Sequence, residues 1–325
     1  MSRACGKIWR MNIDRNFPVS VALAGGVALA TALAAHPADF ARTSVHRAST
    51  HPMRYHLALP RGWKADRAWP VLVVIPSAAR DFAGNLEAFD SARGARPYIL
   101  VAPEVLSCGG ARSRTRDHYS YSAAEWDSLQ GDDFAFEDAG LAVVLADVHR
   151  ELRGDTRAFL TGWEAGGHTV WAQIFRHPER WRGVAPVTTN YQSRGVTASS
   201  FSRAPERATL PIQPFRCGAP SADAMQAIPY CDQQTAQALR EAREHGFAPR
   251  PVRMVPGADH GPLPEAVLAW CDSLVRISAP KARRLSRRRG RSLRSPRSRR
   301  SSPRPAPQAA PVDHSPAIAR IERVH

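Results

Sequence analysis

The stretch GWEAGG, residues 162–167, has the composition of a tight turn between a strand and a helix. Small residues on both sides of a central side chain accommodate a strained backbone and a helix packed closely behind it. Such a turn presents its central residue at the carboxyl end of a strand. That residue is Glu164, so a carboxylate stands where the geometry favours an attacking group.

Strand-like and helix-like segments alternate on both sides of this turn. The β-branched runs 70–76 and 97–103 are typical of strands buried on both faces of a parallel sheet. A helix capped by Asp132 or Asp133 is predicted next, because apolar residues recur there at helical spacing; they are Leu141, Val144, Val148 and Leu152. Further strands are expected at 53–59, 157–162, 182–188, 210–217 and 250–257, and helices at 164–175, 232–246 and 263–274. This alternation predicts an α/β fold with a mostly parallel sheet and helices on both faces.

Between Met53 and Leu274 the chain resembles secreted α/β-hydrolase esterases of the polyhydroxybutyrate-depolymerase and feruloyl-esterase type. The resemblance rests on the segments ALPRGWKADRAWPVLVVI, EDAGLAVVLADVHRELRGDTRAFLTGWEAGG, FRHPERWRGVAPV and PGADHGP. It implies an α/β-hydrolase fold, in which a serine on the turn attacks an ester carbonyl. A histidine near the C-terminus then removes the serine proton, and an acid orients the histidine.

The resemblance carries two of these roles onto this chain. His260, in GADHGP after the last expected strand, matches the catalytic base. The acid should follow the strand at 210–217, where the family has an aspartate a few residues after a His-Gly. This chain has CGAPSADAM there, so Asp223 is the candidate, displaced by a couple of residues, and Asp259 is the fallback.

Two parts of the family's machinery are altered. Glu164 replaces the serine, and a glutamate does not form the usual acyl-enzyme. The loop after the first buried strand reads PSAARD instead of His-Gly, and Pro76 removes one backbone donor. A single oxyanion donor is worth roughly 3 kcal/mol of barrier lowering. The oxyanion groups carried over are the amide of Ala165, in its expected place, and Ser77 in the altered loop.

Three hypotheses follow for the function. The chain can be a hydrolase-fold protein without ester hydrolysis, keeping its pocket as a binding site, with Glu164 in a salt bridge to His260 or an arginine. It can instead use Glu164 as a carboxylate nucleophile, as dehalogenases and epoxide hydrolases use aspartate. The extra methylene then shifts the attacking atom by about 1.5 Å, which matters near 3 Å contact. Finally, hydrolysis can be retained through Ser77 or a water held by Glu164.

A polar and aromatic insertion at 107–133 lies where this fold often shapes the substrate mouth. Four aromatic side chains are candidates for ligand binding, three of them in the insertion and one on the turn: Tyr119, Tyr121, Trp126 and Trp163. The alternative is a surface loop packed by its own aromatics. Asp132 and Asp133 fit a helix start better than a metal site, and no metal or cofactor is expected.

The formal charge of +16 is concentrated in one segment. Residues 281–304 hold 12 of the 45 basic residues and no acidic one, which leaves 33 basic against 29 acidic residues, a net +4, elsewhere. The Arg-, Ser- and Pro-rich tail at 278–325 is predicted to be disordered. It is either an electrostatic tether to an anionic polymer or membrane surface, or a solvated tail without a role. Specific nucleic-acid recognition is not expected.

The N-terminus favours export. Arg10 and Arg15 precede the apolar run 17–35, which ends in TALAAHP and offers small residues to a signal peptidase. Residues 1–35 are therefore expected to be a signal peptide or a membrane anchor, 36–50 a linker and 51–277 the hydrolase-like domain. Four cysteines follow, an even number for an oxidising compartment. One or two disulfides, with Cys217–Cys231 the shortest loop, or four buried thiols are the alternatives.

Overall fold

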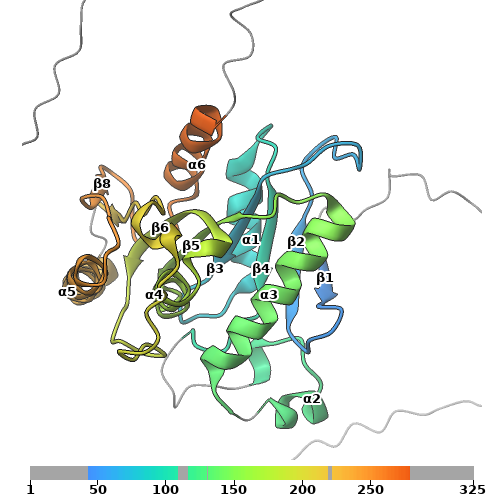
Figure 1. Ribbon diagram of the computed structural model, residues 1–325, viewed down its shortest axis with the longest axis horizontal. Helices are drawn as coiled ribbons and strands as arrows, with labels where there is room; N and C mark the ends of the chain where they lie inside the picture. The colour runs from blue at the N-terminus through green and yellow to red at the C-terminus, as the bar shows by residue number, and fades with distance from the viewer. Residues whose placement is uncertain (1–42, 109–115, 130, 219–221, 279–325) are drawn as a thin grey trace, which may run out of the picture. The chain divides into compact units, whose positions relative to one another are not determined.

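The computed structural model describes residues 43–108, 116–129, 131–218 and 222–278 (Figure 1). Its centre is an eight-stranded sheet in the order β1-β2-β4-β3-β5-β6-β7-β8. The pairs β1–β2 and β2–β4 are antiparallel, and every other pair is parallel. The strands are β1 Ser44–Arg47, β2 Arg54–Ala58, β3 Val71–Ile75, β4 Ile99–Pro103, β5 Ala158–Glu164, β6 Trp181–Thr189, β7 Phe215–Cys217 and β8 Arg253–Val255.

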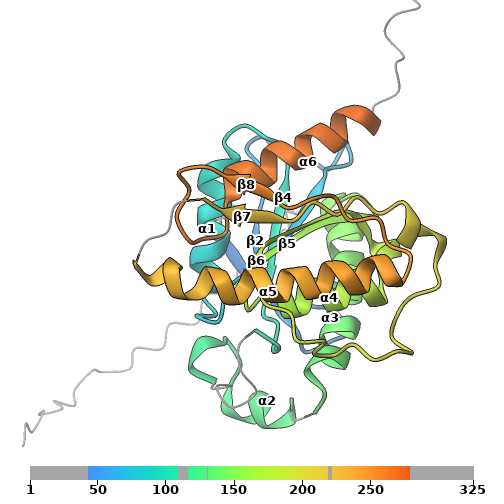
Figure 2. The same ribbon diagram turned by 90° about the vertical axis from the view of Figure 1, so that its left-hand side faces the viewer.

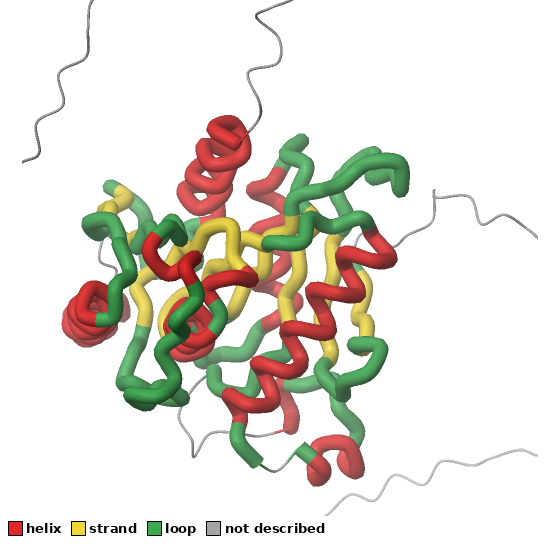
Figure 3. Tube along the Cα trace, in the orientation of Figure 1, coloured by secondary structure: helices red, strands yellow, loops and turns green. Residues whose placement is uncertain are grey.

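Six α-helices connect or flank these strands in the described residues (Figure 3). They are α1 Phe82–Arg93, α2 Ala123–Ser128, α3 Asp133–Leu152, α4 Gly167–Arg176, α5 Ala222–Glu244 and α6 Pro264–Ser278. Helices α3 and α4 lie on one face of the sheet and α1 on the other (Figures 1 and 2). The predicted α/β class with a mostly parallel sheet is confirmed.

The local chemistry explains where the elements begin. All five residues of β3 are buried, as its continuous apolar run predicts. Helix α3 starts where its cap was predicted, because the Asp132 carboxylate accepts hydrogen bonds from the amides of Phe134 and Ala135. Leu141, Val144 and Val148 are buried on its inner face.

Arg93 at the end of α1 is buried, with 2% of its surface exposed. Its guanidinium donates to the backbone carbonyls of Ala58, Leu59 and Tyr98, at 3.0, 2.8 and 2.6 Å, and pairs with Asp90. The five donors of a guanidinium suit such a site, because they satisfy several acceptors at once. Arg93 thus ties α1 to the segments around β2 and β4.

Some expectations differ from the structure. The sheet begins with β1 at Ser44, inside the range expected as a linker, and α1 was not predicted. Helix α5 starts at Ala222, well before the expected 232. Cys108, Cys217, Cys231 and Cys271 are buried free thiols, so the Cys217–Cys231 disulfide is not formed.

The chain's contacts divide it after Cys271. The described residues up to Cys271 belong to one compact unit, and the end of α6 from Asp272 belongs to another. The N-terminal targeting segment and the basic tail lie outside the described residues. Within the described residues, no helix combines the length and apolarity that a membrane span requires.

Candidate active site at the carboxyl ends of the strands

The GWEAGG turn has the strained backbone that its composition indicates. Strand β5 ends at Glu164 with φ of +49°, a left-handed conformation that costs a non-glycine residue free energy. The Gly166 amide then donates to the Trp163 carbonyl at 3.0 Å, and α4 begins at Gly167. This is a sharp strand-to-helix turn that lifts the Glu164 side chain from the sheet edge.

The glycines of the turn are required by close packing. A Cβ on Gly166 would lie 2.3 Å from the Pro76 carbonyl oxygen, and one on Gly162 would lie 2.7 Å from a Val170 methyl. A Cβ on Gly167 would lie 2.4 Å from Thr189. A Cβ closer than 3.0 Å to another heavy atom would force that atom to move. The turn is therefore packed tightly between the loop after β3 and the end of β6.

Glu164 is half-buried, and its carboxylate has no hydrogen-bonding or ion-pair partner among the described residues. Among the described residues it makes no ion pair or hydrogen bond through its side chain, so the expected salt bridge to His260 or an arginine is not formed. Its charge still acts on its surroundings. It contributes to the raised pKa of the Cys231 thiol, after the effect of burial, and to the raised pKa of His260.

His260 lies in the loop after β8, within electrostatic reach of Glu164. Its ring meets the edge of the Trp163 ring at 5.3 Å between centroids, and its amide donates to the exposed Asp259 carboxylate at 2.7 Å. The pKa of His260 is raised, chiefly by an interaction with the Cys217 thiol and then by the charges of Cys217, Glu164 and Asp259. The structure therefore brings the predicted base to the turn.

The sequence singled out the cysteine at the end of β7 only as a possible disulfide partner. Cys217, the last residue of β7, is buried, and its sulfur lies 3.8 Å from the carbonyl oxygen of Gly261, the residue after His260, while the side chain of Asp223 lies outside the described residues. Asp259 reaches the backbone of His260 through its carboxylate. A thiol at the end of β7 thus lies beside the loop that carries His260.

The two oxyanion candidates differ in how their groups are used. Ala165 is buried, and its amide donates to no other described residue in the turn. The Ser77 hydroxyl accepts from the Ala79 amide at 3.3 Å, within its own turn. The close approach of Gly166 to Pro76 places the loop that carries Ser77 against the strand-to-helix turn at residues 162–167, the elbow.

The aromatic insertion is largely packed on itself. Tyr119 and Tyr121 are buried, and both rings pack with Trp126, at 4.9 and 6.4 Å between centroids. Their hydroxyls are also engaged: Tyr119 donates to the Val105 carbonyl, and Tyr121 accepts from the Arg54 amide. The two tyrosines present little free surface, whereas Trp126 and Trp163 are half-buried, and Trp163 lies beside His260.

A buried carboxyl that the sequence did not flag lies behind the turn. Glu137 on α3 is 1% exposed and accepts from the amide and hydroxyl of Ser107, at 2.6 and 3.0 Å. The Ser107 hydroxyl also bonds the Thr169 hydroxyl on α4 at 2.7 Å. Burial raises the pKa of Glu137 to about 7 despite these hydrogen bonds. Nearby on α4, burial lowers the pKa of His168 to about 4.

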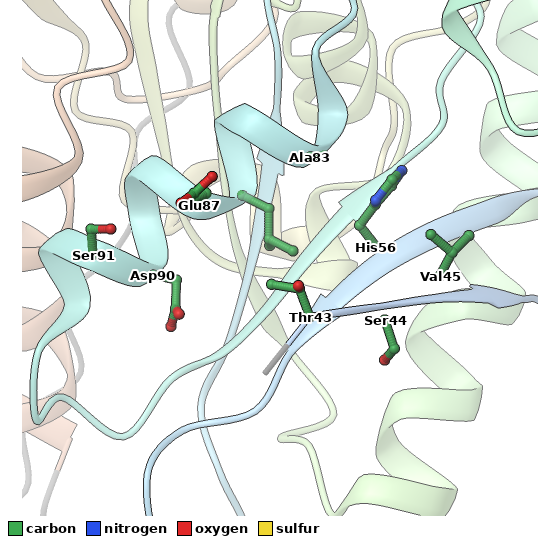
Figure 4. Close-up of a pocket in the computed structure, with 9 residues that line it drawn as sticks. Thr43, Ser44, Val45, His56, Ala83, Glu87, Asp90 and Ser91 are labelled. Carbon is green, nitrogen blue, oxygen red and sulfur yellow. The ribbon is translucent and has the colours of Figure 1, made fainter. Parts of the chain in front are cut away.

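A cavity of about 530 Å³ lies elsewhere, between β1, β2 and α1 (Figure 4). None of the predicted site residues lines it, and Glu87, Asp90 and His56 are its titratable groups. The described residues contain no cluster of three or more histidine, cysteine or acidic side chains that could hold a metal ion.

The order of the sheet, its antiparallel second strand and the elbow after β5 define an α/β-hydrolase fold. No family model and no curated protein matches the chain.

Several solved structures resemble the chain. One is described as a dipeptidyl aminopeptidase IV from Bacteroides ovatus (15% identity, 72% of this chain, 34% of that chain, TM-score 0.48). Another is poly(aspartic acid) hydrolase-1 from Sphingomonas sp. KT-1 (16% identity, 72% and 97%, TM-score 0.48). A third is the poly(3-hydroxybutyrate) depolymerase LpqC from Bordetella parapertussis (18% identity, 70% and 85%, TM-score 0.45). The chain spans about a third of the first of these, and the fold assignment depends on sheet order and elbow geometry.

Proposed function

We propose that this protein is an exported, ligand-binding member of the α/β-hydrolase fold that does not hydrolyse esters through an acyl-enzyme at its elbow. The observation that carries the proposal is Glu164 at the elbow, with a left-handed backbone and an uncommitted carboxylate. A carboxylate at this position repels the oxyanion that an acyl-enzyme reaction develops. The ligand is a small, ester-like or cationic molecule, because the half-buried carboxylate of Glu164 favours positive or neutral groups.

A second function is favoured by the freedom of that same carboxylate. Glu164 is not tied up in an ion pair, and His260 lies within its electrostatic reach. A free carboxylate beside a base can attack an alkyl carbon, forming an ester that water activated by the histidine then hydrolyses. Epoxides and haloalkanes are the substrates that distinguish this reaction from ester hydrolysis.

The test compares three forms of the purified full-length protein: the natural chain, Glu164→Ser and Glu164→Gln. Steady-state turnover of p-nitrophenyl butyrate is expected to be absent in the natural chain and in Glu164→Gln, and to appear in Glu164→Ser. Ester turnover by the natural chain that Glu164→Gln abolishes would overturn the proposal. Turnover of an epoxide or haloalkane that requires Glu164 would establish the second function instead.

The basic tail supports a separate part of the proposal, an electrostatic tether to an anionic polymer or membrane surface. Its charge density is high, with 12 basic residues between positions 281 and 304 and no acidic one. Such binding weakens with salt, because it releases counterions. Deleting residues 281–325 is expected to lower the salt concentration needed to elute the protein from heparin resin. Elution at an unchanged salt concentration would contradict the proposal that the tail is an electrostatic tether.

A further inference from the structure

A basic cavity of about 310 Å³ lies at the end of the sheet opposite to the elbow. It is formed between the loop before β3 and the turn after α3, which lie side by side (Figure 1). These two segments meet where Trp69 pairs with Gly154, just before β3 and β5 begin. Since the elbow lies at the other end of β5, the basic cavity is separate from the candidate active site.

Hydrogen bonds hold the two walls of the basic cavity in place. The Trp69 amide donates to the Arg153 carbonyl at 2.8 Å, and the Asp155 amide donates to the Trp69 carbonyl at 2.8 Å. The Trp63 indole donates to the Leu152 carbonyl at 3.0 Å. Trp69 itself is buried. The walls are therefore fixed relative to each other before any ligand binds.

Arg153 occupies its place in the wall at a cost in backbone free energy. It follows the last residue of α3 with φ of +58°, a left-handed conformation that favours glycine at the end of a helix. Its Nε atom donates to the Ala65 carbonyl at 3.2 Å, which ties the side chain to the opposite wall. A long cationic side chain at a strained position points to a role for that side chain.

Two more basic side chains line the cavity, and each is oriented by a contact of its own. The Arg67 guanidinium lies 3.8 Å from the centre of the Trp69 ring, a cation–π contact. His149 Nδ1 lies 2.7 Å from the Gly154 carbonyl oxygen, which only accepts, so Nδ1 carries a hydrogen. The His149 Nε2 atom has no hydrogen-bonding partner among the described residues.

The two guanidinium groups have no carboxylate partner. Within the described part of the chain, neither Arg67 nor Arg153 forms an ion pair. Asp66 is the one acidic residue in the lining, and Asp155 nearby already pairs with Arg182 at 3.1 Å. Like charges around one cavity repel each other, and an anion between them would relieve that repulsion.

We propose that the basic cavity binds a tetrahedral oxyanion, either free phosphate or sulfate or the phosphate of a lipid headgroup. Arg67 and Arg153 donate to its oxygens, because a guanidinium group binds an oxyanion through paired donors. His149 adds a third contact through Nε2 when it is protonated. All three side chains are exposed, so the rest of the ligand stays in solvent.

The experiment follows hydrogen–deuterium exchange of the purified full-length protein in sodium phosphate, with sodium chloride of equal ionic strength as the reference. Exchange should slow in the peptides that cover residues 61–69 and 149–156. The slowing should reach about 10-fold at ten times the dissociation constant. Because the site is read peptide by peptide, phosphate held by the basic tail does not contribute. Equal exchange in phosphate and in chloride would overturn the proposal.

Two variants assign the roles. Arg67→Ala and Arg153→Gly should each raise the half-saturating phosphate concentration by about 10-fold, which is about 1.4 kcal/mol. Glycine adopts the left-handed backbone readily, so weaker binding by Arg153→Gly reports the missing guanidinium and not a lost helix end. Arg61→Ala is the matched control, because it removes the same charge from the same loop outside the cavity lining. An equal rise in Arg61→Ala would show a dependence on net charge alone and contradict the site.

Vesicles distinguish the two sources of the oxyanion. The natural chain and the double variant Arg67→Ala with Arg153→Gly are sedimented with phosphatidylcholine vesicles that contain phosphatidic acid. Weaker sedimentation of the double variant would support a lipid headgroup, whereas equal sedimentation together with protection by phosphate would support a free oxyanion. Neither arginine lies at the elbow, so ester turnover by Glu164→Ser should not change when both are replaced. The two proposals therefore fail independently.

Discussion

Replacing Glu137 with glutamine tests how strongly the interior behind the elbow penalises a charge. Glu137 is 1% exposed, and burial raises its pKa from an ordinary 4.5 to about 7. At about 1.4 kcal/mol for each pKa unit, this corresponds to roughly 3 kcal/mol of folding free energy. Glutamine keeps the shape and can both accept from the Ser107 amide and donate to the Ser107 hydroxyl.

The direction of the pH effect follows from where the proton is held. A carboxyl with a raised pKa binds its proton more tightly in the folded protein than in the unfolded chain. Its contribution to stability is fully present below pH 4.5 and is lost as the pH rises through about 7. Glu137→Gln has no such loss. The free energy of unfolding of the variant should therefore rise by roughly 2–3 kcal/mol relative to that of the natural chain as the pH goes from 5 to 8.

Urea unfolding at pH 5, 6, 7 and 8 measures this difference, and comparing two proteins cancels the histidines that titrate in the same range. Glu125→Gln is the control. Hydrogen bonds from Ser122 and then Arg54 lower the pKa of Glu125 to about 2, so its linkage lies below pH 4.5 and its difference from the natural chain should stay constant. A constant difference for Glu137→Gln over the same range would refute the reasoning.

Two further predictions concern packing. Gly166→Ala places a Cβ 2.3 Å from a backbone carbonyl oxygen and should destabilise the protein by about 1–3 kcal/mol. The control, Gly131→Ala, places its Cβ in open space and should change the stability by less than about 0.5 kcal/mol. Equal urea midpoints for the two variants would contradict the tight packing of the elbow. Arg93→Met leaves three buried carbonyls without their donor and should cost roughly 3 kcal/mol. Arg93→Lys should recover less than half of that loss in the same urea assay, because an ammonium does not span the acceptors of a guanidinium.

The periodic parts of the chain could be predicted because their signal is local. A continuous β-branched run such as 71–75 has few alternatives to a buried strand, and Asp132 directly precedes the helix that it caps. Helix α1 was missed because its apolar stripe is short, with Phe82, Leu86 and Phe89 buried among polar residues. Strand β1 was missed because a four-residue edge strand becomes recognisable only through its pairing with β2.

The site was only partly predictable, for a different reason. Glu164 and His260 could be found because each lies in a glycine-rich context with a fixed relation to a strand. The position of Cys217 beside the His260 loop could not, since it depends on the parallel pairing of β7 with β8. The signal that remained in the sequence was a cysteine at the last position of an expected strand, and that is too common to identify a partner.

The elbow itself says less about activity than its glycines suggest. The left-handed backbone at Glu164 and the lack of room for a Cβ at Gly162, Gly166 and Gly167 are demanded by turning from β5 into α4 under the loop after β3. They are required whichever side chain occupies position 164, so they identify a fold. Evidence for chemistry has to come from groups that the turn does not need. Here that group is the carboxylate of Glu164, which makes no side-chain hydrogen bond or ion pair among the described residues.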